Sequence, residues 1–368
     1  MSLDAIRNVA IQIEMATEYF HLFGKLHGKD VAEQLDTFNA KAKYLAKTVH
    51  PDMVLPEHKV EAEKVFVPLM KLITSGRIAI TEGTYNTPFA KQPEFEIVCP
   101  DRSYSFRNIP FKKGHISMLY RGYTKNSDRV QVLAKISRNP SCNPMLFQEA
   151  DILKELFPQA ISEYIPTVFD TTTVSVGGKQ YAVVITSFQD GYYSLAEILS
   201  AYPNGFDPLN AAWIGRRVIA QALCAKILES IHSSIIPDHI LIHPESHKPM
   251  HIGWGHSLRP SKGGVAILNK IIPIRREYYP PEVFRREELT RSADIFMVGK
   301  ILVKIFGGDI QSNVIPNALP KPLRLCIQRC IEKHPRSRYQ DPAELMDEFT
   351  SCVRDAWGKK FSTLKFPK

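Results

Sequence analysis

Two helix-forming patterns joined by a proline turn constrain the fold of this chain more than any other feature of its sequence. Between residues 31 and 49 the apolar residues recur at spacings of four and three, which places them on one face of a helix. A second set with similar spacing follows between residues 62 and 73, and two such helices bury their apolar faces against each other. The apolar residues are Val31, Leu35, Phe38, Ala42, Leu45 and Val49 in the first set, and Ala62, Val65, Phe66, Leu69, Met70, Leu72 and Ile73 in the second. The sequence therefore predicts an all-α helical hairpin near the start of the chain.

The turn between the two patterns carries His50, Pro51 and Asp52, which we call the tip. Proline disfavours helical backbone in the residue before it, so we expect the first helix to end at His50 and the tip to be displayed. A lone histidine beside a lone aspartate lacks a buried nucleophile or a set of metal ligands, so the pattern favours a contact site over a catalytic one. Pro68 lies inside the second pattern, where a proline costs about 3 kcal/mol unless the helix starts or kinks there. We therefore expect Pro68 to alter the angle between the two helices of the hairpin.

Two segments, one before the first helix and one in its second half, resemble J-domains, the co-chaperone modules that stimulate DnaK-type chaperone ATPases. Residues 18–20 (Glu-Tyr-Phe) and 22–24 (Leu-Phe-Gly) are similar to the opening helix of that family, and residues 42–47 lead into the tip as its second helix does. The resemblance implies that Asp52 engages an arginine of the chaperone ATPase while the basic helix lies on an acidic surface. It predicts a chaperone-binding site made of His50, Pro51, Asp52, Lys41, Lys43 and Lys47. An ordinary helical hairpin, with the lysines on a solvated face, is the alternative.

The rest of the chain has a different pattern. Residues 82–93 carry turn formers and no periodicity, which is typical of a linker. Strand-like runs follow at residues 118–120, 130–136 and 181–186, before a long helical pattern at residues 211–231. A β-rich part followed by an α-rich part indicates an α+β fold. We therefore predict a multidomain chain that has a helical domain at residues 1–81, a linker at 82–93, an α+β domain at 94–357 and a basic tail at 358–368.

Within residues 94–357, a collinear series of motifs resembles protein kinases. Val-Leu-Ala-Lys at residues 132–135 and Glu149 in a helical stretch look like the kinase lysine and its helix glutamate. Residues 279–282 (Tyr-Pro-Pro-Glu) resemble the end of the activation segment, residues 292–299 resemble the buried helix that follows it, and residues 330–339 resemble the late arginine motif. The resemblance implies a bilobal kinase-like fold with an internal ion pair between Glu282 and Arg338.

The positions that carry kinase chemistry do not match. Phosphoryl transfer needs an aspartate to accept the hydroxyl proton and acidic or amide ligands to hold magnesium. After residues 231–234 (Ile-His-Ser-Ser) the His-Arg-Asp segment of the family is missing or shortened, His239 stands in place of a metal-binding asparagine, and Gly253 stands in place of a metal-binding aspartate. Asp238 is a candidate for a displaced base, although its place before an apolar run is more typical of a turn into a strand. The resemblance therefore predicts a pseudokinase with no catalytic residues and no metal site.

Nucleotide binding stays open. The phosphate loop at residues 112–117 keeps one glycine, Gly114, and so loses close backbone approach to phosphates. Lys135 and Glu149 are retained, which would allow ATP to bind without magnesium. The alternative is a salt bridge that only fixes a helix. We expect no other cofactor.

Composition limits the compartment and the partners. No apolar run approaches the roughly 18–20 residues needed to cross a membrane, and the six cysteines are scattered without a CxxC pair. We expect a cytoplasmic protein with reduced, mostly packed cysteines and no membrane contact. The net charge of +9 permits an acidic partner, but we expect no nucleic acid because no aromatic and basic recognition module is evident. The lysine-rich tail is interpreted as a solvated or docked terminus.

These predictions combine into a co-chaperone that recruits and stimulates a DnaK-type chaperone ATPase through residues 1–81. An inactive kinase-like domain would bind a client or partner protein that the sequence does not identify. The chain looks like bacterial and phage proteins that join a J-domain to a kinase-like domain. The alternatives are an unconventional protein kinase and a metal-independent nucleotide-binding regulator.

Overall fold

A computed structural model describes residues 3–16, 19–81, 83, 85, 94–125, 129–159, 161–260 and 266–358. Glu18, almost all of the predicted linker and all of the predicted tail after Gly358 lie outside these residues. The chain divides by its contacts into two compact units, described separately below. The first consists of Met1–Cys142 and Thr172–Ile185, and the second of Asn143–Thr171 and Thr186–Lys368.

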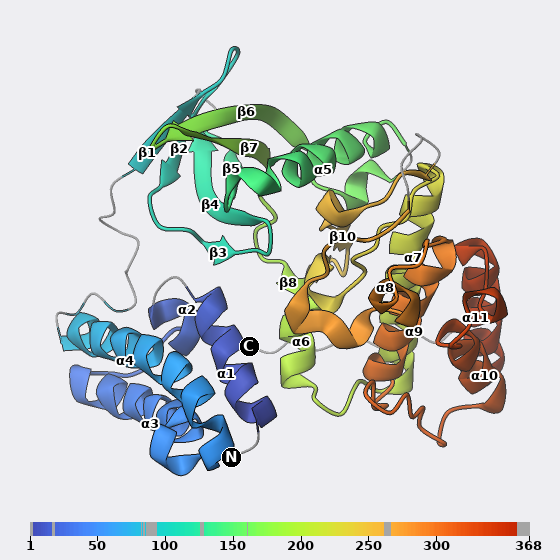
Figure 1. Ribbon diagram of the computed structural model, residues 1–368, viewed down its shortest axis with the longest axis horizontal. Helices are drawn as coiled ribbons and strands as arrows, with labels where there is room; N and C mark the ends of the chain where they lie inside the picture. Colours follow the sequence, from blue (N-terminus) through green and yellow to red (C-terminus); the bar gives the residue numbers. More distant parts are fainter. Residues whose placement is uncertain are drawn as a thin grey trace. The chain divides into compact units, whose positions relative to one another are not determined.

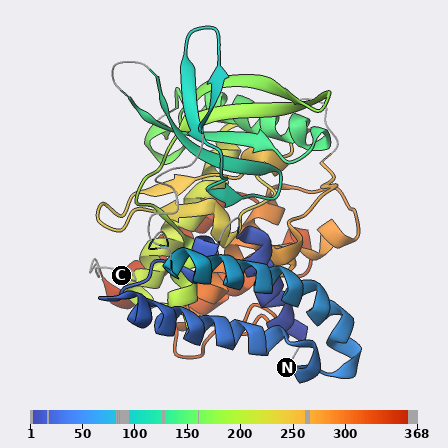
Figure 2. The same cartoon turned by 90° about the vertical axis from the view of Figure 1, so that its left-hand side faces the viewer.

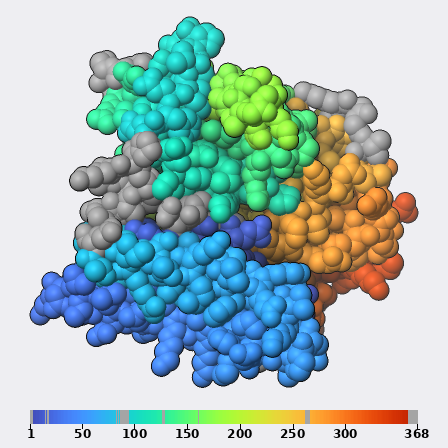
Figure 3. All heavy atoms as spheres, turned by 60° about the vertical axis from the view of Figure 1, so that its left-hand side comes forward, coloured from blue at the N-terminus to red at the C-terminus, as the bar shows by residue number. Residues whose placement is uncertain are grey.

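The first unit begins with a group of packed helices (Figure 1). They are α1 (Leu3–Met15), α2 (Tyr19–Phe23), α3 (Val31–Val49) and α4 (Lys59–Thr81). Asp30 caps α3, because its side chain accepts a hydrogen bond from the backbone N of Glu33 at 2.9 Å, and His50 ends the helix in extended conformation. The prediction of a helix over residues 31–49 that ends at His50 is therefore confirmed. Helices α3 and α4 pack along each other, as both ribbon views show (Figure 2), and their outward surface appears in blue in Figure 3.

The predicted apolar faces form one core between these helices. Its buried residues on α3 and α4 include Phe38, Ala42, Leu45, Val49, Ala62, Val65, Leu69 and Ile73. Gly76 allows the helices to approach closely, since a Cβ there would lie 2.5 Å from the Phe38 ring. The prediction is wrong at Val31, the first residue of α3, which is 43% exposed.

Helix α4 does not start at Pro68, which leaves an altered hairpin angle at this residue as a prediction. It begins at Lys59 and is assigned as one helix through Pro68 to Thr81. Pro68 and Lys64 both lie on the exposed side, so water can hydrogen-bond to the Lys64 carbonyl that an amide N–H would otherwise occupy.

A sheet with strand order β1-β2-β4-β5-β7-β6 follows, and β3 pairs with β4. The pairs β1–β2, β2–β4, β3–β4 and β4–β5 are antiparallel. Its strands are β1 (Glu94–Val98), β2 (Ser103–Arg107), β3 (Lys112–Lys113), β4 (Ser117–Thr124), β5 (Gln131–Ser137), β6 (Val168–Val176) and β7 (Lys179–Ser187). The strands predicted at residues 118–120, 130–136 and 181–186 are confirmed within β4, β5 and β7, apart from Val130, which precedes β5.

The second unit is mostly helical, with one small sheet of strand order β10-β9-β8. Its helices are α5 (Asn143–Leu156), α6 (Leu195–Ala201), α7 (Pro208–Ile227), α8 (Pro281–Phe284), α9 (Arg291–Ile305), α10 (Lys321–Cys330) and α11 (Pro342–Trp357), and its strands are β8 (Tyr193–Ser194), β9 (Ile240–Ile242) and β10 (Pro249–His251). Helix α9 is buried along almost its whole length and packs on α7 and α10. The α+β expectation is confirmed.

Helix α7 differs from the pattern predicted at residues 211–231. It begins at Pro208, because Asp207 accepts hydrogen bonds from the backbone N of Leu209 and Asn210 and proline fits the first turn. It ends at Ile227, shortly before Glu229 takes a positive φ of 49°. Of the last apolar residues of the pattern, Leu228 therefore belongs to the turn that follows, and Ile231 forms an isolated β-bridge with Leu258.

Candidate functional site

The tip lies between α3 and α4 as a short 3-10 turn, Pro51–Met53. The His50 ring packs edge-on against Phe66 at a centroid distance of 4.9 Å, and its Nδ1 accepts a hydrogen bond from the backbone N of Asp52 at 3.2 Å. The backbone N of Met53 donates to the carbonyl of His50 at 2.9 Å. The imidazole therefore has a fixed place on the hairpin and holds the backbone that presents Asp52.

The Asp52 carboxylate is presented to solvent, with its side chain 73% exposed. One oxygen lies 3.5 Å from the Lys59 Nζ and the other lies 3.8 Å from the His50 Nδ1. Exposed pairs of this kind contribute only about 0–1 kcal/mol, so a partner cation can replace them. The predicted exposure of Asp52 is confirmed, while His50 is 41% exposed and leans on Phe66. The sequence pattern gave no sign that Lys59 would neighbour Asp52.

The three predicted lysines on α3 do not share one environment. Lys41 donates a hydrogen bond to the carbonyl of Phe23 at 3.2 Å, and partial burial lowers its pKa. Lys43 and Lys47 are exposed one helical turn apart. Tyr44, which is 71% exposed, lies on α3 beside them. It did not stand out as a candidate in the sequence because it lies outside the apolar stripe of this helix. The structure thus leaves Lys43 and Lys47 as the outward cations and uses Lys41 to anchor α2.

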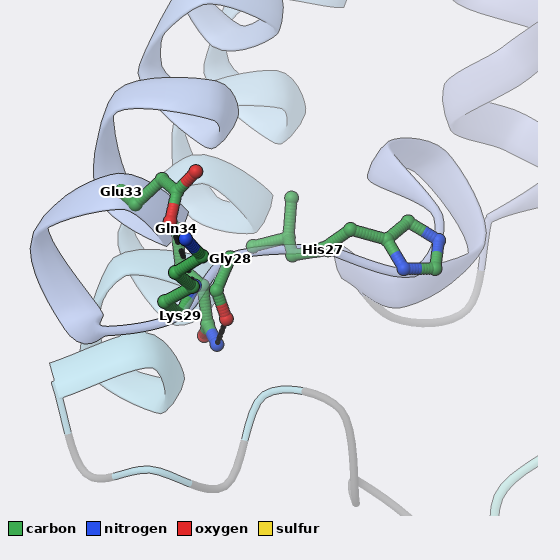
Figure 4. Close-up of a pocket in the computed structure, with 6 residues that line it drawn as sticks. His27, Gly28, Lys29, Glu33 and Gln34 are labelled. Carbon is green, nitrogen blue, oxygen red and sulfur yellow. Dashed lines mark hydrogen bonds between the residues drawn. The ribbon is translucent and has the colours of Figure 1, made fainter.

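A shallow hollow opens where the chain enters α3 (Figure 4). It is lined by Leu26, His27, Gly28, Lys29, Glu33 and Gln34. Two of its polar groups bond within the hollow: the Lys29 backbone N donates to Glu33 Oε2 at 2.7 Å, and the Gln34 Nε2 donates to the Gly28 carbonyl at 3.4 Å. His27 points away from the other labelled side chains. These contacts cap α3 and call for no ligand.

In the second unit, a buried polar cluster surrounds His232. The Asp294 carboxylate accepts hydrogen bonds from the backbone N of His232 at 2.7 Å and of Ser233 at 2.9 Å, and burial raises its pKa to about 7. Gln221 Nε2 lies 2.8 Å from His232 Nε2, and the Ser234 hydroxyl donates to the carbonyl of Gly253 at 2.8 Å. Burial lowers the pKa of His232 well below its usual value, so the ring is neutral at neutral pH.

His239 and Gly253, expected at two metal-binding positions of the kinase family, contact each other directly. Gly253 has a φ of 85°, and a Cβ there would lie 2.2 Å from the His239 Nδ1. His239 Nδ1 also lies 2.8 Å from the carbonyl of Ser234, which fixes the ring in this place. An aspartate at position 253 would therefore clash with His239 and would need an unfavourable backbone conformation.

Asp238 is held in an ion pair. Its two oxygens accept hydrogen bonds from Arg275, at 2.5 Å from Nε and 3.0 Å from Nη2. The residue lies in the turn Pro237–His239 directly before β9, which confirms the interpretation as a turn into a strand. The Arg275 guanidinium thus occupies both oxygens of this carboxylate.

The residues predicted for nucleotide binding lie on different elements. Lys135 is buried on β5 and Gly114 lies in the turn between β3 and β4, both in the first unit. The backbone N of Gly114 donates to the carbonyl of Ser117 at 2.8 Å, so this amide is used to close the turn. Glu149 is buried on α5 in the second unit.

The predicted ion pair between Glu282 and Arg338 is confirmed. Two hydrogen bonds of 2.6 and 3.0 Å join the side chains, and both are almost fully buried. Arg338 also donates to the carbonyls of Ser292, Glu332 and Lys333. The guanidinium thereby joins the segment that carries α8 to the start of α9 and the end of α10.

Other predictions concern cysteines, metals and membranes. All six cysteines are described, none forms a disulfide, and all but Cys352 are buried; Cys326 and Cys330 share the buried face of α10. Within the described residues, no group of three or more His, Cys, Asp or Glu side chains is placed to hold a metal ion. Across the same part of the chain, no helix combines the length and the apolar character needed to cross a membrane.

Comparison with known proteins gave no further guide to the family: no protein-family model matches the chain, and no curated protein is significantly similar to it.

Proposed function

We propose that the chain is a co-chaperone whose N-terminal helices act as a J-domain on a DnaK-type chaperone ATPase. The observation that carries this proposal is the tip, an exposed aspartate held between two packed helices by a neighbouring histidine. A carboxylate presented in this way can accept two parallel hydrogen bonds from an arginine of a partner. Lys43 and Lys47 add positive charge on the same helix that leads to the tip, and they suit an acidic surface on the chaperone.

In this proposal the rest of the chain is an inactive kinase-like domain that binds a client or partner protein in the cytoplasm. Its likeness to kinases is supported by the buried ion pair of Glu282 and Arg338 and by the buried helix α9. The lack of kinase activity is supported at the positions where kinases carry their catalytic base and metal ligands. Neither Ser233 nor Ser234 brings a carboxylate, and the contact of His239 with Gly253 leaves no room for a metal-binding side chain at position 253.

A matched pair of variants tests the chaperone role. Asp52→Asn keeps the volume of the side chain and removes its charge, whereas Asp36→Asn makes the same change at an exposed position on α3. We expect Asp52→Asn to lower the stimulation of ATP hydrolysis by a purified DnaK chaperone about tenfold or more, since a charge-assisted contact is lost. Asp36→Asn should stimulate as the wild type does. Equal stimulation by the wild type and Asp52→Asn would contradict the proposal.

A further inference from the structure

A cluster of basic and aromatic side chains lies on the second unit and consists of residues not discussed above. It consists of Trp213, Arg216 and Arg217 on α7, His247 in the turn between β9 and β10, and Tyr164 in the short 3-10 turn Ser162–Tyr164; we call it the basic–aromatic patch. Positions 213, 216 and 217 share one face of α7 at spacings of three and four, and all are half-buried. The patch was missed in the sequence because its members come from separate segments.

The contacts within the patch are specific. The Arg217 guanidinium lies 3.4 Å from the centroid of the Trp213 ring and donates to the Trp213 carbonyl at 3.1 Å. The His247 ring meets the same indole at a centroid distance of 5.3 Å. Burial and the neighbouring Arg216 together lower the pKa of Arg217 to about 10, while Tyr164 acts in the opposite direction. Aromatic rings thus hold Arg217 in place beside another cation.

The two arginines have no counter-charge. Among the described residues, neither Arg216 nor Arg217 forms an ion pair, and the Nε of each is buried without a hydrogen-bond partner. Two half-exposed arginines of this unit, Arg285 and Arg329, pair with Glu287 and Glu344, whereas the half-buried Arg291 and Arg324 form no ion pair among the described residues. Arg216 and Arg217 differ from those two in being adjacent, and adjacent guanidiniums that repel each other without a counter-charge are stabilised when an anion binds.

We propose that the basic–aromatic patch binds an acidic segment of a partner protein, with glutamate or aspartate carboxylates received by Arg216 and Arg217. The carboxylates approach the Nη groups of the two guanidiniums, because both Nε atoms are buried. A single-stranded nucleic acid fits less well, because such ligands stack their bases on open aromatic faces and Arg217 already covers Trp213. The inference rests on the proposed role of this part of the chain in partner binding, and it names the chemistry of that partner.

Fluorescence anisotropy with a dye-labelled octaglutamate peptide tests this inference on the full chain. We expect salt-sensitive binding that weakens about tenfold or more in the double variant Arg216→Gln/Arg217→Gln, since both charged contacts are lost. The double variant Arg285→Gln/Arg354→Gln removes the same charge from exposed arginines of this unit that lie near their own carboxylates, and it should bind within about twofold of the wild type.

Three outcomes would overturn the inference: no binding by the wild type, equal weakening in both double variants, or tighter binding of an oligothymidylate that depends on Arg216 and Arg217. Because the two arginines and the tip belong to different units of the chain, Arg216→Gln/Arg217→Gln should stimulate the chaperone ATPase as the wild type does. A failure of the patch is therefore distinguishable from a failure of the co-chaperone role, which would appear as unstimulated ATPase with every form of the chain.

Discussion

The contact between His239 and Gly253 predicts a specific non-additive effect on stability. In Gly253→Ala the new methyl group would lie 2.2 Å from the His239 ring, in a backbone conformation with a φ of 85°. The conformation alone costs a residue with a side chain about 1–2 kcal/mol. Overpacking against the ring adds about 1–3 kcal/mol, so the variant should lose about 2–5 kcal/mol of unfolding free energy.

Gly191→Ala is the matched control, since it has a φ of 75° and its nearest neighbour, His243, would lie at an ordinary contact distance of 3.4 Å. It should lose only the conformational part, about 1–2 kcal/mol. In a His239→Ala background, Gly253→Ala should cost about 1–3 kcal/mol less unfolding free energy than in the wild type, because the ring that the methyl group would meet is absent. This difference is the coupling free energy between the two sites.

Urea unfolding followed by tryptophan fluorescence measures these losses, because Trp254 is fully buried next to Gly253. The reasoning would be refuted if Gly253→Ala were no less stable than Gly191→Ala. It would equally be refuted if the effects of Gly253→Ala and His239→Ala were simply additive.

Three further predictions follow from other sites. Arg338→Met should lose about 3–5 kcal/mol of unfolding free energy because Glu282 would remain buried and uncompensated, whereas Arg285→Met at an exposed pair should lose under about 1 kcal/mol; similar losses in urea unfolding would contradict this. Incubation with labelled ATP, magnesium and generic protein substrates should transfer no phosphate, and labelling that disappears in Lys135→Met would disprove inactivity. Burial lowers the pKa of His251 to about 4, so the folded state resists protonation and stability falls as the pH drops from about 6.5 toward 4. His251→Gln should remove up to about 3 kcal/mol of that dependence, and an unchanged profile of unfolding free energy against pH would argue against it.

Local signals predicted much of the fold. The bounds of α3 were predicted from apolar spacing and from the proline after the helix, both of which act within a few residues; the capping Asp30 was seen only in the structure. The ion pair of Glu282 and Arg338 was predicted because the resemblance to kinases links two distant segments. Neither result depended on knowing how the remaining elements pack.

Features set by packing were not predictable. Helix α4 passes through Pro68 because that side of the helix is exposed, and Lys41 turns to the carbonyl of Phe23 because α2 lies beside α3. The contact of His239 with Gly253 and the basic–aromatic patch each join separate segments. Patterns in a single sequence do not show which distant segments contact each other. The residue types at these sites could be read from the sequence, but their proximity could not.

The central claim is that the tip acts on a DnaK-type chaperone independently of the kinase-like part. The most direct test is single-turnover ATP hydrolysis by the purified chaperone in the presence of wild type, Asp52→Asn or Lys135→Met. We predict that Asp52→Asn loses about tenfold or more of the stimulation with its melting temperature nearly unchanged, and that Lys135→Met retains it in full. Equal stimulation by the wild type and Asp52→Asn would contradict the account.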